Sequence, residues 1–287
     1  MRLRAAAKVN WALEVLGRRE DGYHEVRTIL QTIDLCDTLE FEPAEELRLE
    51  VHGPHEPSED DLVLRTARLL DGGAGRGALI RLTKRIPVAS GLGGGSSDTA
   101  AALRGLNEVW GLGHSQVELA ALAAQLGSDV PFFLTGGTAL AEGRGQRVTP
   151  LPDGTQTWLV VLAPPITLAD KTATMYAALT PDDFSDGSTT VALAERIRRG
   201  VAVDDAALRN AFDRVAYERF EGLVAYREAL LAAGATSVHV AGAGPALFAL
   251  AADEAAAREM LARLRSPGGQ AFAARTLTSA EALAEEG

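Results

Sequence analysis

The stretch Pro87-Val-Ala-Ser-Gly-Leu-Gly-Gly-Gly-Ser-Ser-Asp-Thr-Ala-Ala101 joins a glycine-rich segment to two serines and an alanine-rich run of helical character. Glycines lack Cβ and tolerate positive φ, so several N–H groups can turn toward one anion. Ser96 or Ser97 is expected to cap the following helix, whose free N–H groups and dipole favour negative charge at the same place. The stretch predicts a phosphate-binding loop. The alternative is a flexible linker, which is not usually followed at once by a helical run.

Several better-known motifs are absent from the sequence. It has no Gly-x-x-x-x-Gly-Lys-Ser/Thr, and no glycine of the loop satisfies Gly-x-Gly-x-x-Gly. The protein-kinase set of motifs and the Gly-x-Ser-x-Gly elbow of hydrolases are missing as well. A Walker-type ATPase, a simple Rossmann dehydrogenase, a protein kinase and an α/β-hydrolase are therefore poor interpretations.

Composition narrows the class of protein further. The 287 residues carry a formal net charge of −11, which argues against nucleic acid as a partner. An anionic substrate then needs a local basic pocket. The single Cys36 cannot form an internal disulfide, in keeping with a reducing compartment. Lys8, Asn10 and Glu14 interrupt any signal-peptide core, and no run approaches the ~20 apolar residues of a membrane span. We expect a cytoplasmic protein, as a monomer or weak homodimer, with no membrane partner.

The order of predicted elements indicates an α+β fold. Strand patterns, helical patterns and turn residues divide the chain into strands at 3–16 and 26–42, a helix at 62–70, a strand at 78–84, helices ending near Gly111 and Gly127, and an extended segment at 131–137. The second half reads as a strand at 158–163, helical periodicity over 191–233, two strands around a glycine turn at 237–250, a helix at 253–264 and a strand at 270–278. The polar stretch 150–154 is the candidate boundary between domains 1–153 and 154–287.

Two isolated charged residues are candidates for chemistry. Lys8 sits between apolar residues of the first predicted strand, which makes a partly enclosed ammonium more frequent than for most lysines. A solvated surface charge is the ordinary alternative, and spacing alone does not decide between the two. Asp129 follows the helix stop at Gly127, where a turn or N-cap aspartate is the ordinary alternative.

Two turns are candidates for binding. Tyr23 and His24 follow an Asp-Gly pair, so a tyrosine face could stack on a base while the imidazole reads its edge. The alternative is a hairpin turn with incidental neighbours. The turn from Gly242 to Gly244 offers either a second close approach to phosphate or only a connection between strands.

Taken together, five motifs resemble the small-molecule kinase superfamily of galactokinase, homoserine kinase, mevalonate kinase and phosphomevalonate kinase (GHMP kinases). They are Ala7-Lys-Val-Asn10, Asp21-Gly-Tyr-His24, Lys84 to Asp98, Leu126-Gly-Ser-Asp-Val-Pro-Phe-Phe133 and Gly242-Ala-Gly244. More narrowly, the chain is similar to the 4-diphosphocytidyl-2-C-methyl-D-erythritol kinases of the non-mevalonate isoprenoid pathway. The resemblance implies a two-domain GHMP kinase fold, with an N-terminal domain like domain 2 of ribosomal protein S5 and a ferredoxin-like C-terminal domain.

The resemblance also implies roles for the candidate residues. Asp129 would accept the proton of the substrate hydroxyl as it attacks the γ-phosphorus, and Lys8 beside it would keep that carboxylate ionised and counter phosphoryl charge. Substrate binding would fall to Asn10, Tyr23, His24, Tyr176, Gly242 and Gly244, with cytosine between Tyr23 and Tyr176.

ATP and Mg²⁺ are the implied cofactors. The ATP phosphates would lie on the glycine-rich loop, formed by Pro87, Val88, Ala89, Ser90, Gly91, Leu92, Gly93, Gly94, Gly95, Ser96 and Ser97. Adenine would lie near Asp61, Leu62, Lys84 and Asn107. Mg²⁺ would bridge phosphate oxygens, with Ser97 and Asp129 as the protein ligands to expect.

Two departures from the family pattern are visible. Family members tend to have Asn where this chain has Asp61, so a side-chain amide contact to adenine is in doubt. The late glycine turn often reads Ser-Gly-Ser-Gly, whereas Ala241 and Ala243 here offer no hydroxyl. The rival functions are another GHMP kinase, of the mevalonate or homoserine type, and a nucleotide-binding regulator without catalysis.

Overall fold

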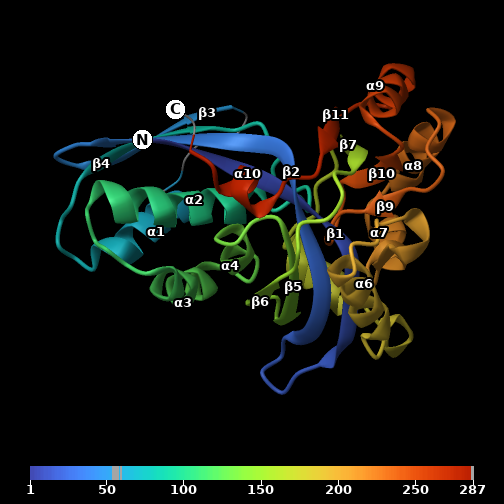
Figure 1. Ribbon diagram of the computed structural model, residues 1–287, viewed down its shortest axis with the longest axis horizontal. Coiled ribbons are helices and arrows are strands. Elements are labelled where there is room, and N and C mark those ends of the chain that lie inside the picture. Colours follow the sequence, from blue (N-terminus) through green and yellow to red (C-terminus); the bar gives the residue numbers. More distant parts are fainter. Residues whose placement is uncertain (54–57, 59, 286–287) are drawn as a thin grey trace.

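The structure of the protein, a computed structural model, describes residues 1–53, 58 and 60–285. Two lobes lie side by side, each built on a β-sheet (Figure 1). The sheet of the first lobe has seven strands, in the path β3-β4-β2-β1-β8 with β5 and β6 attached to β2. These strands are β1 (Arg2–Arg18), β2 (His24–Pro43), β3 (Leu47–His52), β4 (Ala78–Thr83), β5 (Thr138–Gly143), β6 (Arg147–Pro150) and β8 (Arg209–Asn210).

The two long strands β1 and β2 form an antiparallel hairpin that spans both lobes (Figure 1). Their register shifts between Ala6 and Ala7 and again between Asn10 and Ala12. Such bulges bend a strand and re-aim its side chains. Lys8 and Asn10, two residues apart and therefore on one face, lie between these two shifts.

Four helices belong to the first lobe: α1 (Leu62–Asp71), α2 (Gly94–Val109), α3 (Gln116–Leu126) and α4 (Val130–Phe133). Helices α1, α2 and α3 lie on one face of the sheet (Figure 1). The core beneath them includes Phe41, Leu103 and Phe132, all fully buried. At Gly105 a Cβ would overlap the Phe41 ring, so α2 approaches β2 as closely as only a glycine permits.

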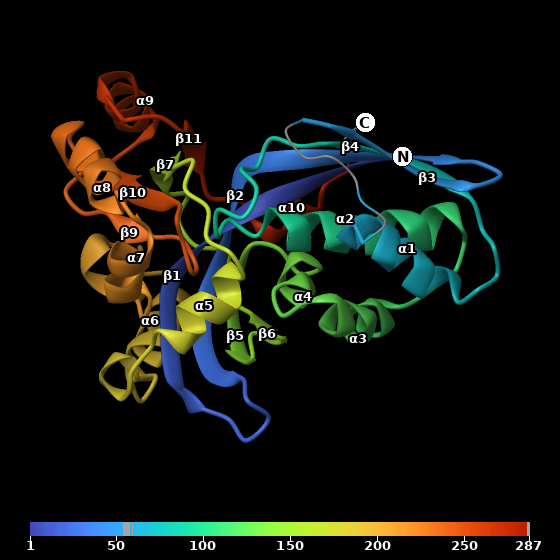
Figure 2. The same cartoon turned by 180° about the vertical axis from the view of Figure 1, so that it is seen from behind.

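The second lobe has a four-stranded antiparallel sheet in the order β11-β7-β10-β9. Its strands are β7 (Trp158–Ala163), β9 (His239–Val240), β10 (Leu247–Ala251) and β11 (Gln270–Arg275). The helices of this half are α5 (Lys171–Ala177), α6 (Ser188–Arg198), α7 (Asp213–Arg219), α8 (Leu223–Ala232) and α9 (Glu254–Arg263). Viewed from behind, α5 is at the junction of the lobes (Figure 2).

The second half of the chain also contributes to the first lobe. Strand β8 pairs in parallel with β1. The last helix, α10 (Ser279–Leu283), contacts β1 and β2, and Glu285 bridges to Leu3. Among the described residues, no helix is long and apolar enough to cross a membrane.

The predicted α+β class and most of the predicted elements are confirmed, with two local corrections. Residues 131–137 are not extended, because 130–133 form the short helix α4, with Pro131 in its first turn. Proline suits that position because its missing N–H is not needed there. The helical periodicity over 191–233 is interrupted by β8.

Candidate active site

A cavity of about 1020 Å³ receives residues from both lobes, including nine of the eleven residues of the expected phosphate loop. The loop reaches α2 through Gly91 and Gly93, both at positive φ. Gly93 is the N-cap of α2 and makes no side-chain cap, so Ser96 and Ser97 lie in the first turn of the helix rather than at its cap. The expectation that a serine caps α2 is therefore wrong. Glycine is needed at both positions because the backbone has a positive φ there and a Cβ would overlap neighbouring atoms.

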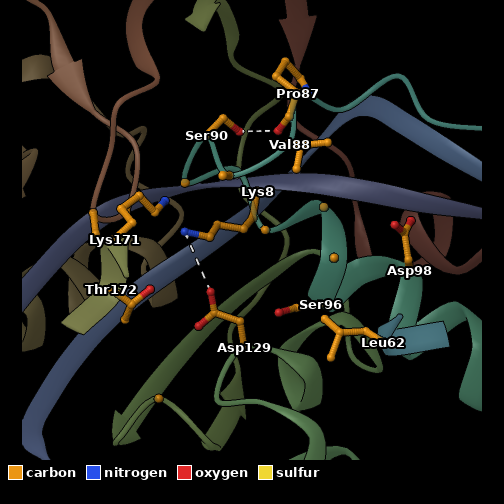
Figure 3. Close-up of a pocket in the computed structure, with 18 of the residues that line it drawn as sticks. Lys8, Leu62, Pro87, Val88, Ser90, Ser96, Asp98, Asp129, Lys171 and Thr172 are labelled. Carbon is orange, nitrogen blue, oxygen red and sulfur yellow. Dashed lines mark hydrogen bonds and ion pairs between the residues drawn. The ribbon is translucent and has the colours of Figure 1, made fainter. Parts of the chain in front are cut away.

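The loop is held tightly from two sides. At Gly91 a Cβ would overlap the carbonyl oxygen of Ala241, in the late glycine turn. At Gly93 a Cβ would stand 2.7 Å from Cζ of Phe133, in α4. The Ser90 hydroxyl donates to the Pro87 carbonyl at 2.7 Å, which closes the start of the loop (Figure 3). The loop is thus a fixed part of the cavity wall, as a preorganised anion site requires.

Lys8 and Asp129 meet in this cavity. Lys8 Nζ lies 3.9 Å from Asp129 Oδ2, although the two residues are far apart in sequence (Figure 3). The Lys8 ammonium also donates to Asn10 Oδ1 at 2.8 Å, and Asn10 Nδ2 donates to the Thr28 hydroxyl at 2.8 Å. Burial lowers the pKa of Lys8, and the charge of Asp129 opposes that effect. An anionic ligand would therefore strengthen the protonated form of Lys8.

The position of Asp129 separates the two interpretations of this residue. It occupies the N-cap of α4, the ordinary place for an aspartate, but its side chain makes no cap hydrogen bond. Instead its carboxylate, 38% exposed, is directed into the cavity toward Lys8 (Figure 3). A structural cap would accept an N–H of the first turn. The carboxylate is thus available for a ligand.

The predicted base-binding residues are only partly brought together. The His24 ring stacks on Tyr176, with centroids 5.0 Å apart, and Tyr176 lines the cavity. Tyr23 is 55% exposed and lies outside the lining, under the Arg144 guanidinium at 4.5 Å. Burial, with a smaller effect of Arg18, lowers the pKa of His24, which favours a neutral imidazole with one donor and one acceptor. The face of Tyr176 that was expected to oppose Tyr23 is next to His24 instead.

The predicted adenine residues divide similarly. Asp61, Leu62 and Lys84 line the cavity. Asp61 is the N-cap of α1 and accepts the Val63 N–H at 2.8 Å. Asn107 is not in the lining, because its amide exchanges two hydrogen bonds with the backbone of His114 in the loop after α2. An adenine contact from Asn107 is therefore not supported by its position.

Lys84 is held at the start of the loop by two buried carboxylates. Its ammonium donates to Asp98 Oδ2 at 2.6 Å and to Asp37, whose other oxygen accepts the backbone N–H groups of Arg85 and Ile86. Burial alone would lower the pKa of Lys84, but Asp98 and Asp37 raise it. Burial raises the pKa of Asp98 well above its usual range, against the pull of Lys84. This cluster joins β2, the loop and α2.

Of the remaining predicted residues, one lines the cavity and the others lie behind its wall. Gly242 lines it, and a Cβ there would stand 2.8 Å from Lys8 Nζ. Gly244 does not line it, and its carbonyl accepts the Lys171 ammonium at 2.7 Å. Leu92 and Ser97 are buried behind the loop. Leu92 contributes its carbonyl to the backbone of Lys8.

The residues around Asp129 would hold Mg²⁺ only as part of a nucleotide complex. No group of three or more His, Cys, Asp or Glu side chains within the described part of the chain could hold a metal ion. Ser97, the other predicted ligand, is buried and does not line the cavity, whereas Ser96 and Asp129 both line it. One carboxylate and one hydroxyl, completed by phosphate oxygens and water, are a donor set that Mg²⁺ accepts.

The polar residues of the lining that sequence reasoning missed include Arg144, Lys171 and Thr172. Arg144 follows β5, and its guanidinium lies over the ring of Tyr23. Lys171 and Thr172 are the first two residues of α5. Lys171 and Thr172 do not belong to a glycine-rich stretch, whereas Arg144 stands between Gly143 and Gly145. One signal was available for Lys171, since the sequence contains only two other lysines, Lys8 and Lys84.

Comparison with known proteins agrees with this arrangement. The description "GHMP kinases N terminal domain" matches residues 61–137, and "GHMP kinases C terminal" matches residues 190–270. A 4-diphosphocytidyl-2-C-methyl-D-erythritol kinase of Dehalococcoides mccartyi is 46% identical over 278 residues, which cover 96% of this chain and 98% of the relative. One of Pelotomaculum thermopropionicum is 45% identical, covering 95% and 96%.

Solved structures give the same result. A crystal structure of 4-(cytidine 5'-diphospho)-2C-methyl-D-erythritol kinase superimposes with a TM-score of 0.81 at 37% identity, covering 96% of this chain and 99% of that one. A mevalonate kinase of L. major superimposes with a TM-score of 0.72 at 17% identity, covering 97% and 96%, which shows a shared fold alone. The chain therefore belongs to the GHMP kinases and, within them, to the family of 4-diphosphocytidyl-2-C-methyl-D-erythritol kinases.

Proposed function

We propose that the protein is an ATP-dependent kinase that phosphorylates the 2-hydroxyl of 4-diphosphocytidyl-2-C-methyl-D-erythritol in the cytoplasm. The observation that carries the proposal is the Lys8–Asp129 pair, 3.9 Å apart in a cavity whose wall is the glycine-rich loop. A proton acceptor, a cation and a phosphate cradle are the parts that phosphoryl transfer to an alcohol needs.

In this mechanism Asp129 accepts the proton of the acceptor hydroxyl as its oxygen attacks the γ-phosphorus. The loose transition state needs little basicity, so the direction of the carboxylate toward the cavity matters more than its strength. Asp129 is held in that direction by the backbone turn before α4 and by Lys8. The hydrogen bond from Lys8 to Asn10 fixes the ammonium in turn.

The ATP phosphates lie along Gly91 to Ser96, where the N–H groups at the start of α2 are directed at them. Lys8 neutralises charge on the transferring phosphoryl group, and its buried surroundings strengthen that interaction. Asp129 and Ser96 would hold Mg²⁺ together with phosphate oxygens, and the ion would supply neutralisation of phosphate charge. Adenine lies toward Asp61, Leu62 and Lys84, with its contacts coming from backbone because Asp61 is engaged as a helix cap.

The cytosine is bound on the side of His24 and Tyr176. The neutral imidazole of His24 has one donor and one acceptor, which match the edge of cytosine. Tyr176 supports that ring from within the cavity. Tyr23, exposed and covered by Arg144, is available to close over the base from outside.

Coupled ADP release against a panel of alcohols tests the proposal. We expect turnover with 4-diphosphocytidyl-2-C-methyl-D-erythritol and none with mevalonate or homoserine. Turnover of mevalonate or homoserine in place of the cytidyl compound would identify another kinase of the superfamily. No ADP release with any alcohol, from a protein that binds ATP, would indicate a regulator without catalysis.

A further inference from the structure

Lysine is rare in this chain and is concentrated in the cavity. Of the 28 basic residues only three are lysines, and all three line the cavity: Lys8, Lys84 and Lys171. Every other basic residue is an arginine. The two side chains are not equivalent, since an ammonium is a compact point charge that turns its three donors to any direction, whereas a guanidinium is a large planar fork. The use of lysine here indicates positions where a compact cation is needed.

Two of the three lysines have partners that account for them. Lys84 is bound by Asp37 and Asp98, and Lys8 contacts Asn10 and Asp129. Lys171, the first residue of α5, is different. Its ammonium donates to the Gly244 carbonyl at 2.7 Å, and no carboxylate of residues 1–53, 58 and 60–285 forms an ion pair with it. One neutral acceptor leaves donors on that ammonium for a ligand.

Without a bound anion, the protonated form of Lys171 is destabilised by its surroundings. Its side chain is turned toward the ammonium of Lys8, above Asp129 (Figure 3). Burial lowers its pKa to about 8, the charge of Lys8 adds to this effect, and Asp129 opposes it. The charged groups that act on it are Lys8 on β1 and Asp129 before α4, and Asp170 at the cap of its own helix and Arg144 also line the cavity. An anion beside the ammonium would compensate the unfavourable position.

The helix that carries Lys171 also carries Tyr176, which lies against His24. Five residues of α-helix correspond to about 7.5 Å along its axis. Tyr176 belongs to the proposed base site, and Lys171 is beside the proposed reaction centre at Asp129. In a diphosphocytidyl alcohol, the two phosphates lie between the base and the reacting alcohol. Lys171 is on that path, next to the backbone of Gly242 and Ala243, which also line the cavity.

We propose that Lys171 binds the diphosphate of the acceptor substrate, and this inference rests on the proposed function. The ammonium keeps its bond to the Gly244 carbonyl and directs its other N–H groups at the phosphate oxygens. The residue selects acceptors that carry a nucleoside diphosphate over uncharged ones. It acts on acceptor binding, whereas Lys8 acts on the transferring phosphoryl group.

The test uses CDP and cytidine, which share the base and ribose but differ in the diphosphate. Calorimetric titration is carried out on the wild type and on Lys171→Met, with Arg258→Met on the exposed face of α9 as the matched loss of one positive charge. We expect the wild type to bind CDP more tightly than cytidine. Lys171→Met should weaken CDP binding at least about tenfold and change cytidine binding less than about twofold, as loss of a charge-assisted hydrogen bond predicts. Arg258→Met should change neither affinity.

The scarcity of lysine provides a second readout. Protein labelled with ¹³C at lysine Cε gives signals from only three side chains, and Lys171→Met identifies one of them. In the free wild type this signal should titrate near pH 8, and saturating CDP, but not cytidine, should move its midpoint upward by about one pH unit or more. A midpoint that CDP leaves unchanged contradicts the proposal.

The kinetic result separates this inference from the proposed function. With ATP saturating, Lys171→Met should raise KM for the diphosphocytidyl acceptor far more than it lowers kcat. A variant that keeps the preference for CDP, or loses kcat with KM unchanged, overturns the role of Lys171 while the kinase assignment stands. A wild type that neither prefers CDP nor turns over the cytidyl acceptor overturns both. Thermal melts show whether the variant is folded.

Discussion

Asp129 shows how a residue type with an ordinary structural use becomes available for chemistry. Both Asp129 and Asp253 occupy helix N-caps. The Asp253 carboxylate accepts the Ala256 N–H at 2.8 Å, as a cap should, whereas the Asp129 carboxylate makes no cap bond and faces Lys8. The same substitution at these two positions therefore distinguishes a structural from a catalytic aspartate.

We expect Asp129→Asn to lower kcat at least about 100-fold, because a positioned proton acceptor contributes that much, with both KM values within a few-fold. Asp253→Asn should leave kcat unchanged, since asparagine caps a helix nearly as well. The measurement is ADP release under saturating ATP and acceptor, with thermal melts of both variants. Retention of more than about a tenth of wild-type turnover by Asp129→Asn would show that this carboxylate is not the proton acceptor.

At the residue scale, the sequence predicted the groups that belong to distinctive motifs. Lys8, Asn10, Asp129 and most of the loop line one cavity. Asn107 does not, because its amide is used by a backbone turn that sequence spacing cannot reveal. Lys171 was missed because the polar segment around it has no distinctive pattern, and its partner Gly244 is 73 residues away.

Helix α2 has two functions that place different demands on its glycines. Gly95, in the first turn, is part of the cavity wall, and a Cβ there would stand 3.4 Å from Leu62 Cδ1, an ordinary contact. Gly105, further along, is packed on the ring of Phe41, where a Cβ would overlap. Gly95 thus lets a ligand come close to the helix, whereas Gly105 lets the helix pack closely on β2.

The substitutions Gly95→Ala and Gly105→Ala should separate these two demands. Both replace glycine inside the same helix, so both gain about 0.5–1 kcal/mol of helix propensity. Gly105→Ala should nevertheless lower the free energy of unfolding by about 1–3 kcal/mol through overpacking. Gly95→Ala should be at least as stable as the wild type but should raise KM for ATP. Urea denaturation and ADP release measure the two effects, and equal stability of the two variants would contradict the close packing at Phe41.

The elements that sequence predicted well are those whose pattern is local. The caps Ser115 and Asp253 and the alternation of β4 identify their elements. The segment after Asp129 was read as extended because a short apolar run does not distinguish a buried strand from one helical turn. Pro131 in the first turn of α4 was the available signal for a helix.

At the scale of the whole molecule, the two sheets are joined by contacts that no local pattern predicts. Asn210, in β8 beside β1, donates to the carbonyls of Val240 and Gly242 at 2.8 Å. Asp213, the first residue of α7, lies near His239 and the backbone of Val240 and Asn210. This connection fixes the late glycine turn against the first lobe and so completes the cavity.

Asp213 should make the stability of the joined lobes depend on pH. Its carboxyl is buried, and Oδ1 has no hydrogen-bond partner among the described residues. Burial raises its pKa from 3.8 to about 6, against the opposing effects of His239, Arg209 and nearby backbone N–H groups. The folded protein therefore binds a proton between these values that the unfolded chain releases. The stability from this group is fully present below about pH 4 and is lost as the pH rises through 6, a change of about 3 kcal/mol.

Asp213→Asn removes this titration while keeping the size and shape of the side chain. We expect the free energy of unfolding of the wild type, relative to Asp213→Asn, to fall by about 2–3 kcal/mol between pH 4.5 and pH 7.5. Other titrating groups are common to both proteins, so the difference between the two isolates Asp213. Urea denaturation followed by both circular dichroism and tryptophan fluorescence provides the measurement, and coincident transitions establish that both lobes unfold together. A difference that stays constant or grows with pH would mean that Asp213 is ionised in the folded protein throughout this range.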